Sequence, residues 1–134
     1  MNEVAMPPPC VAVVDDQESV RKALERLLRS AGFVVRCFGS GAAFLASLSD
    51  FEPACVVLDL HMPPPNGFEV LEILQRNAEP LPVIAISADH SNQNRARLSS
   101  YGVQVFLPKP VDDALLLDAV NAAAPAHTQR QARA

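Results

Sequence analysis

The sequence predicts an α/β fold: a doubly wound (βα)5 sandwich around a five-stranded parallel sheet in the order 2-1-3-4-5. Two observations indicate it. Five short apolar runs alternate with helical patterns along a chain of 134 residues, which is the length of one domain. The runs are continuously apolar, as expected for strands buried on both faces. Right-handed crossovers through helices would join such strands.

The first half of the chain supplies three of the expected strands, at 10–14, 33–38 and 54–59. The clearest helix lies between the first two, because apolar residues at 20, 23, 24, 27, 28 and 31 keep helical spacing. Gly32 is expected to end it. Ser40 is the expected N-cap of a short second helix, and a third helix is expected over 68–77.

The second half supplies two more strands, at 83–86 and 103–107, separated by a polar helix at 91–100. Asp112 or Asp113 is expected to cap the last helix, and Pro125 to end it. The expected organisation is a flexible N-terminal lead at 1–8, one domain at 9–124, and a tail or linker start at 125–134.

Composition narrows the class of protein. Apolar residues make up 49% and the net charge is −4, which argues against broad binding of nucleic acid or anionic membrane by this domain. No apolar run approaches the roughly 20 residues of a membrane span. Three cysteines lie in or beside strand-like runs without CxxC spacing, which is typical of reduced thiols. The expected location is the cytoplasm.

Polar side chains follow four of the five strands. Asp15 and Asp16 follow the first, Asp59 the third, Ser87 the fourth and Lys109 the fifth. The carboxyl ends of parallel strands meet at one edge of a sheet. The order 2-1-3-4-5 places the first and third strands side by side at the switch point, where such folds bind ligands. The three carboxylates are therefore expected to share one pocket.

Three adjacent carboxylates need a cation or raised pKa values, because like charges about 4 Å apart cost several kcal/mol at an effective dielectric near 20. Oxygen ligands completed by water suit Mg²⁺ or Mn²⁺. Asp59 could then act as a nucleophile and form an aspartyl phosphate. Ser87 offers a hydroxyl and Lys109 a positive charge to phosphoryl oxygens.

Over residues 9–123 the chain resembles the receiver domain of two-component response regulators, the CheY-like family. The matching residues are Asp15, Asp16, Asp59, Met62, Pro63, Gly67, Ser87, Phe106, Lys109 and Pro110. The resemblance implies that a histidine kinase or histidine phosphotransfer protein phosphorylates Asp59. It further implies a surface made of the fourth helix, fifth strand and fifth helix that switches as a result. The protein would be a phosphoacceptor signalling domain and not a turnover enzyme, beyond self-catalysed phosphoryl transfer and autodephosphorylation.

The resemblance also implies individual roles. Asp15, Asp16, Asp59 and the backbone carbonyl of His61 would hold Mg²⁺. Lys109 would bind the phosphate, and the Lys109–Pro110 peptide would be cis. Ser87 would move toward the phosphoryl group while Phe106 turns inward.

Two positions are expected to influence how long the phosphorylated state lasts. His61 and Asp89 stand two residues beyond Asp59 and Ser87, where relatives control the access of water to the phosphoryl group. We expect this pair to tune the phosphorylated lifetime.

A homodimer that forms on phosphorylation is a further expectation. The stretch from Lys109 to Asp113 resembles receivers attached to helix-turn-helix effectors of the NarL/FixJ type.

Each of these residues would have a more ordinary role if it stood alone. Asp15 and Asp16 would suit an acidic helix start, Ser87 a turn and Lys109 a solvated surface.

Two alternative functions use a similar set of acids. A Mg²⁺-dependent phosphatase or phosphotransferase with an aspartyl nucleophile typically has a second acid two residues later, where this chain has His61. A non-phosphorylated pseudo-receiver that acts in dimerisation would not need the complete acid set.

Overall fold

The computed structural model describes residues 8–76, 80–103 and 105–133 and has the predicted topology. Five parallel strands form one sheet in the order β2-β1-β3-β4-β5. The elements in chain order are β1 Cys10–Val14, α1 Glu18–Ser30, β2 Val34–Phe38, α2 Gly41–Ser47, β3 Cys55–Asp59, α3 Gly67–Leu74, β4 Val83–Ser87, α4 Asn92–Ser100, β5 Val105–Pro108 and α5 Asp113–Arg133.

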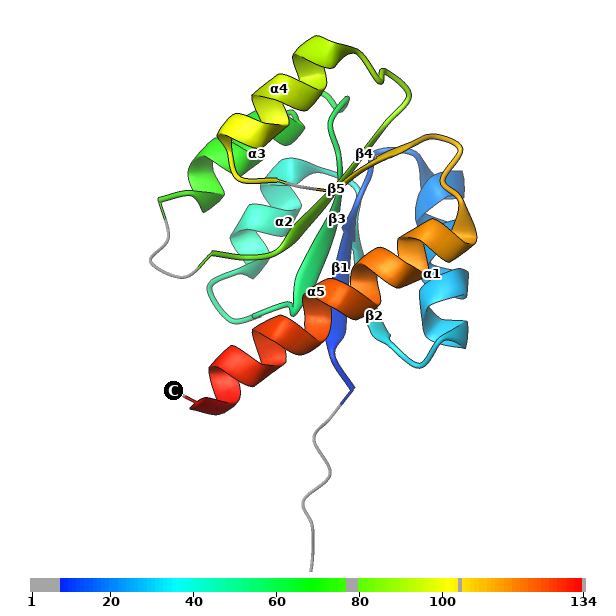
Figure 1. The fold of residues 1–134 in the computed structure, drawn as a ribbon, viewed down its shortest axis with the longest axis vertical. Coiled ribbons are helices and arrows are strands. Elements are labelled where there is room, and N and C mark those ends of the chain that lie inside the picture. The colour runs from blue at the N-terminus through cyan, green and yellow to red at the C-terminus, as the bar shows by residue number, and fades with distance from the viewer. Residues whose placement is uncertain (1–7, 77–79, 104, 134) are drawn as a thin grey trace, which may run out of the picture.

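Helices cover both faces of the sheet and bury two apolar clusters (Figure 1). Helices α1 and α5 cover one face and α2, α3 and α4 the other. The three central strands are almost completely buried, which explains why their sequences are continuously apolar rather than alternating. The largest fully buried side chains are Phe44, Leu28, Leu58, Leu60, Ile84, Ile86, Leu98 and Leu116.

The register of the sheet places the polar strand ends side by side. Val14 of β1 is the partner of Leu58 in β3, so the residues that follow them, Asp15 and Asp59, leave the sheet as neighbours. On the other side, Ser87 at the end of β4 is the partner of Pro108 in β5. The predicted meeting of the strand ends at one edge is therefore confirmed.

Local sequence determines most helix ends as expected. Gly32 follows the C-cap of α1 with a φ of 95°, a conformation that glycine adopts without steric cost. The Ser40 hydroxyl accepts a hydrogen bond from the N–H of Ala43 at 3.1 Å. Of the two candidate caps of α5, Asp112 is the one used, because its Oδ1 accepts from the N–H of Leu115 at 3.0 Å.

Several predicted boundaries are wrong. Helix α3 begins one residue early, at Gly67, because Asn66 and Glu69 form a capping box, and it ends at Leu74. Strand β5 begins at Val105 and not at 103. Helix α5 continues past Pro125 to Arg133. A proline removes one intrahelical hydrogen bond, but the alanines around it favour helix.

The predicted domain limits remain a prediction. Residues 1–7 of the expected N-terminal lead, like the predicted helical residue Asn77, lie outside the described residues. Within the described ranges, no helix has both the length and the apolar character needed to cross a membrane.

Candidate functional site

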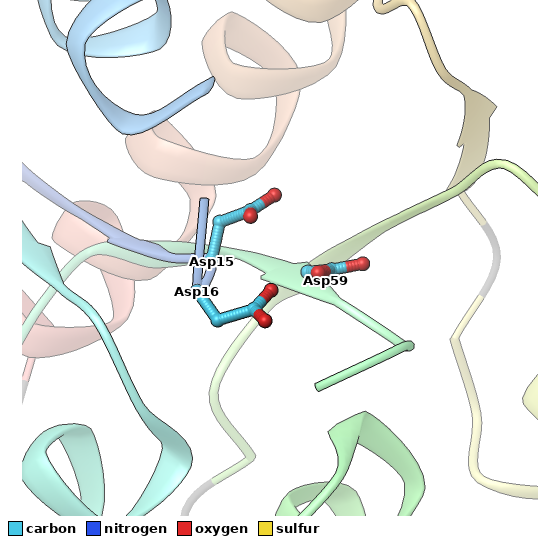
Figure 2. Close-up of side chains that lie close together, drawn as sticks. All are labelled: Asp15, Asp16 and Asp59. Carbon is cyan, nitrogen blue, oxygen red and sulfur yellow. The ribbon is translucent and has the colours of Figure 1, made fainter. Parts of the chain in front are cut away.

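An acidic cluster stands where β1 and β3 end (Figure 2). One carboxylate oxygen from each of Asp15, Asp16 and Asp59 lies within 4.8 Å of the others. Asp15 and Asp59 are only 0% and 2% exposed, whereas Asp16 is open to solvent. The structure thus brings together the three acids that were expected to share one pocket.

Backbone hydrogen bonds hold the two buried carboxylates. The N–H of Gln17 donates to Asp15 Oδ1 at 2.9 Å, and the N–H of His61 donates to Asp59 Oδ1 at 3.2 Å. Behind Asp59 the chain passes very close to Gly67, where a Cβ would lie 2.6 Å from the Asp59 carbonyl oxygen. Only a glycine lets the β3–α3 loop close at this distance.

Among the ion pairs of the described residues, only those of Lys109 involve the acids of the cluster. Its Nζ lies 2.8 Å from Asp15 Oδ2 and 3.5 Å from Asp59 Oδ2. The N–H of Lys109 donates to the carbonyl of Ser87 at 3.0 Å, which attaches the loop after β5 to the end of β4. The Lys109–Pro110 peptide is cis, the isomer that the resemblance implies.

The charge balance of the site leaves Asp59 poorly stabilised as an anion. Burial raises its pKa from 3.8 to about 6, and the neighbouring Asp15 carboxylate contributes to this rise. The His61 N–H and the Lys109 ammonium oppose the rise in pKa and do not cancel it. A second positive charge in the pocket would therefore favour the ionised form of Asp59.

The donor set fits a divalent cation. Asp15 Oδ2 is buried and receives no hydrogen bond from the described part of the chain; its short contact with Lys109 Nζ is an ion pair without hydrogen-bond alignment. The single Lys109 ammonium faces two buried carboxylates, so the site keeps an excess of negative charge that a divalent cation would balance. Asp15, Asp16 and Asp59 offer hard oxygen ligands, which suit Mg²⁺.

The other predicted residues lie around this centre. The buried Ser87 hydroxyl accepts a hydrogen bond from the N–H of Asp89 at 3.0 Å. Asp89 and His61 are both exposed, and the Asp89 carboxylate accepts from the N–H of Ser91 at 3.0 Å. Their role in controlling water remains a prediction.

Phe106 is half-buried beside α4. The Arg95 guanidinium carbon lies 5.1 Å from the centre of its ring, and the His90 ring meets it edge-on at 6.3 Å. Phe106 also packs against the cluster on the α2–α3–α4 face. It thus borders both core and surface, where a change of rotamer would alter the outer face.

Two residues of the site were not predicted from the sequence. The Gln17 carboxamide oxygen accepts from Lys109 Nζ at 3.4 Å, and Arg21 Nη1 donates to the Asp15 carbonyl at 2.8 Å. Arg21 belongs to the polar stripe of α1, which predicts only a solvated face. The one available signal was that it comes six residues after Asp15, near the start of the helix.

A doubly wound sheet with acids and a lysine at its carboxyl edge is the architecture of receiver domains, and comparisons with known proteins agree. The family described as response regulator receiver domain matches residues 11–121. The transcriptional regulatory protein TdiR of Thauera aromatica is 41% identical over 113 residues, which are 84% of this chain and 50% of TdiR. The response regulator protein TmoT of Ectopseudomonas mendocina is 34% identical over 113 residues, 84% of this chain and 51% of TmoT.

Solved structures agree as well. The response regulator StyR has a TM-score of 0.81 and 37% identity, over 94% of this chain and 64% of that one. A response regulator receiver protein from Burkholderia phymatum has a TM-score of 0.77 and 39% identity, over 87% and 95% of the two chains.

The chain belongs to the response regulator receiver domain family of two-component systems. Receiver domains generally bind Mg²⁺ through an acidic pocket, and this chain has the corresponding Asp cluster. The chain spans about half the length of the curated regulators TdiR and TmoT.

Proposed function

We propose that Asp59 accepts a phosphoryl group from a histidine kinase or histidine phosphotransfer protein. The observation that carries this proposal is the placement of a nearly sealed carboxylate at the sheet edge, with two further acids within 4.8 Å and an ammonium at 3.5 Å. The carboxylate is the nucleophile, the acids hold a metal, and the ammonium meets the negative charge of the incoming group.

In this reaction a bond forms between an Asp59 carboxylate oxygen and phosphorus while the bond from phosphorus to the donor histidine nitrogen breaks. The released imidazole takes up a proton. Asp15, Asp16, Asp59 and the His61 carbonyl would hold Mg²⁺, which supplies positive charge for phosphoryl oxygens when bound. Lys109 supplies a further charge, and the Ser87 hydroxyl a hydrogen-bond donor.

Phosphorylation adds roughly −1.5 to −2 charges at Asp59, and we propose that Ser87 and Phe106 pass this change to the surface of α4, β5 and α5. Helix α4 suits a mobile element, because Leu98 is its only buried residue in the described structure. A homodimer through this surface and control of the lifetime by His61 and Asp89 belong to the same proposal. The domain would act as a switch, with self-catalysed phosphoryl transfer and autodephosphorylation as its own chemistry.

Incubation with Mg²⁺ and acetyl phosphate, followed by intact mass spectrometry, tests the central step. We expect a mass increase of one phosphoryl group that is absent from Asp59→Asn and from samples with EDTA. The variant Asp50→Asn, which changes an exposed acid outside the site, serves as the control and should still be labelled. If the wild-type protein binds Mg²⁺ but takes up no phosphoryl group, the proposal is wrong.

A further inference from the structure

Three hydrogen bonds fix Asp15 from different directions. Its N–H donates to the carbonyl of Phe38 at 3.1 Å, and its Oδ1 accepts from the N–H of Gln17 at 2.9 Å. Its carbonyl oxygen accepts from Arg21 Nη1 at 2.8 Å. Main chain and side chain are both held, and the remaining oxygen, Oδ2, is buried and receives no hydrogen bond from the described part of the chain. The residue is thus oriented before any metal binds.

The Arg21 side chain is itself tightly placed. The residue is half-buried in the first turn of α1, where its N–H donates to the carbonyl of Gln17 at 3.1 Å. Its own carbonyl accepts a weak hydrogen bond from the Cys37 thiol at 3.9 Å. The guanidinium lies against Gly39, where an added Cβ would stand 3.3 Å from Nη1. The guanidinium is therefore hydrogen-bonded to the end of β1 and has little free space toward the turn after β2.

The bond to the Asp15 carbonyl also determines where the next residue points. This carbonyl is part of the peptide group that links Asp15 to Asp16, and a peptide group is planar. Holding the oxygen therefore sets the direction in which the chain enters Asp16, whose side chain is exposed to solvent. A charge-assisted hydrogen bond of 2.8 Å is among the stronger ways to hold such a plane.

We propose that Arg21 is a positioning residue of the metal centre, which orients the Asp15–Asp16 peptide so that both carboxylates converge on one cation. The inference rests on the proposed function, since it concerns the same Mg²⁺ site. Partners that orient metal ligands without touching the metal typically change metal affinity by about 10–100-fold when they are removed.

The charge of Arg21 makes the direction of the effect diagnostic. A guanidinium near a cation site repels the cation, so its removal would strengthen Mg²⁺ binding if charge were its main effect. Loss of positioning predicts the opposite, because the two carboxylates would have to be ordered when Mg²⁺ binds. The two effects have opposite signs, and a single affinity measurement separates them.

The test is isothermal titration of Mg²⁺ into wild type, Arg21→Met and Arg21→Lys. Methionine keeps the apolar stem and loses charge and donors, so we expect Mg²⁺ to bind roughly tenfold more weakly. Lysine keeps one charged donor and should recover most of the affinity. The matched control Arg26→Gln removes a positive charge from an exposed position of α1 and should bind as wild type does. An NMR spectrum should show a shifted Asp16 amide in Arg21→Met, because that amide shares the Asp15 peptide group.

The possible results point in different directions. Mg²⁺ binding by Arg21→Met that is equal to or tighter than that of wild type would overturn the role of Arg21. So would failure of both Arg21→Met and Arg21→Gln to fold, judged by circular dichroism, because Arg21 would then serve folding. A wild-type protein that does not bind Mg²⁺ would instead contradict the metal site of the proposed function.

Discussion

Asp59 carries a negative charge in a site that is almost sealed from water, so we expect Asp59→Asn to stabilise the metal-free protein. Burial and the Asp15 carboxylate raise the pKa of Asp59 from 3.8 to about 6. At a pH where Asp59 is ionised, this difference in pKa corresponds to a destabilisation of the folded protein by about 3 kcal/mol. Asparagine has nearly the same shape as a protonated aspartate and removes the buried charge. The variant should therefore unfold on the order of 10 °C higher at pH 7.5 in EDTA.

The pH dependence of the folding stability follows from the direction in which the pKa of Asp59 is shifted. The folded protein binds this proton more tightly than the unfolded chain does, so the stability from protonated Asp59 is fully present below about pH 4. It is lost as the pH rises through about 6. The stability difference between Asp59→Asn and wild type should thus be largest above pH 6 and vanish toward pH 4.

Urea denaturation followed by circular dichroism measures the difference in stability between Asp59→Asn and wild type. The experiment is done in EDTA at several pH values from 4 to 8, roughly the range over which Asp59 titrates. Asp16→Asn is the matched control, because it changes an acid of the same cluster that is exposed and should have a much smaller effect. Equal midpoints for wild type and Asp59→Asn at pH 7.5, or a difference that grows on acidification, would refute the reasoning.

Two further predictions concern the loop that follows Asp59. Gly67→Ala should lower the free energy of unfolding by about 2 kcal/mol, because the new Cβ would lie 2.6 Å from backbone atoms of both Asp59 and Leu60; an unchanged urea midpoint would contradict this. Asn66→Ala should cost about 1 kcal/mol through loss of the capping box of α3, whereas Asn66→Asp, which keeps a capping oxygen, should stay close to wild type in the same assay.

The sequence was sufficient for the fold and for the meeting of three acids and a lysine at one edge of the sheet, because strong local patterns encode the strands and their ends. A continuously apolar run that ends in a carboxylate indicates both the strand and its carboxyl end, as 54–59 does with Asp59. Helix boundaries were less predictable. Asn66 and Glu69 begin α3 through a capping box. The preference of Pro125 alone predicts a helix end, whereas α5 continues through it to Arg133.

Gln17 and Arg21 show the limit of such patterns. Both are polar residues at the start of an amphipathic helix, and the periodicity of that helix predicts only that they face solvent. Their contacts with Lys109 and with the Asp15 carbonyl depend on how α1 is placed over the end of β1. The spacing of six residues between Asp15 and Arg21 permits this contact but does not specify it, because it depends on the placement of the helix.

By itself the sequence determined which chemical groups this protein has at its strand ends, since apolar periodicity defines the strands and the residue types that follow them can be read directly. Only the tertiary structure decided what those groups do to one another. It buried Asp15 and Asp59 together, left Asp16 exposed, and placed Lys109 between the two buried acids. The physical reason is that burial and separation set the energy of a charge, and both depend on how distant segments pack.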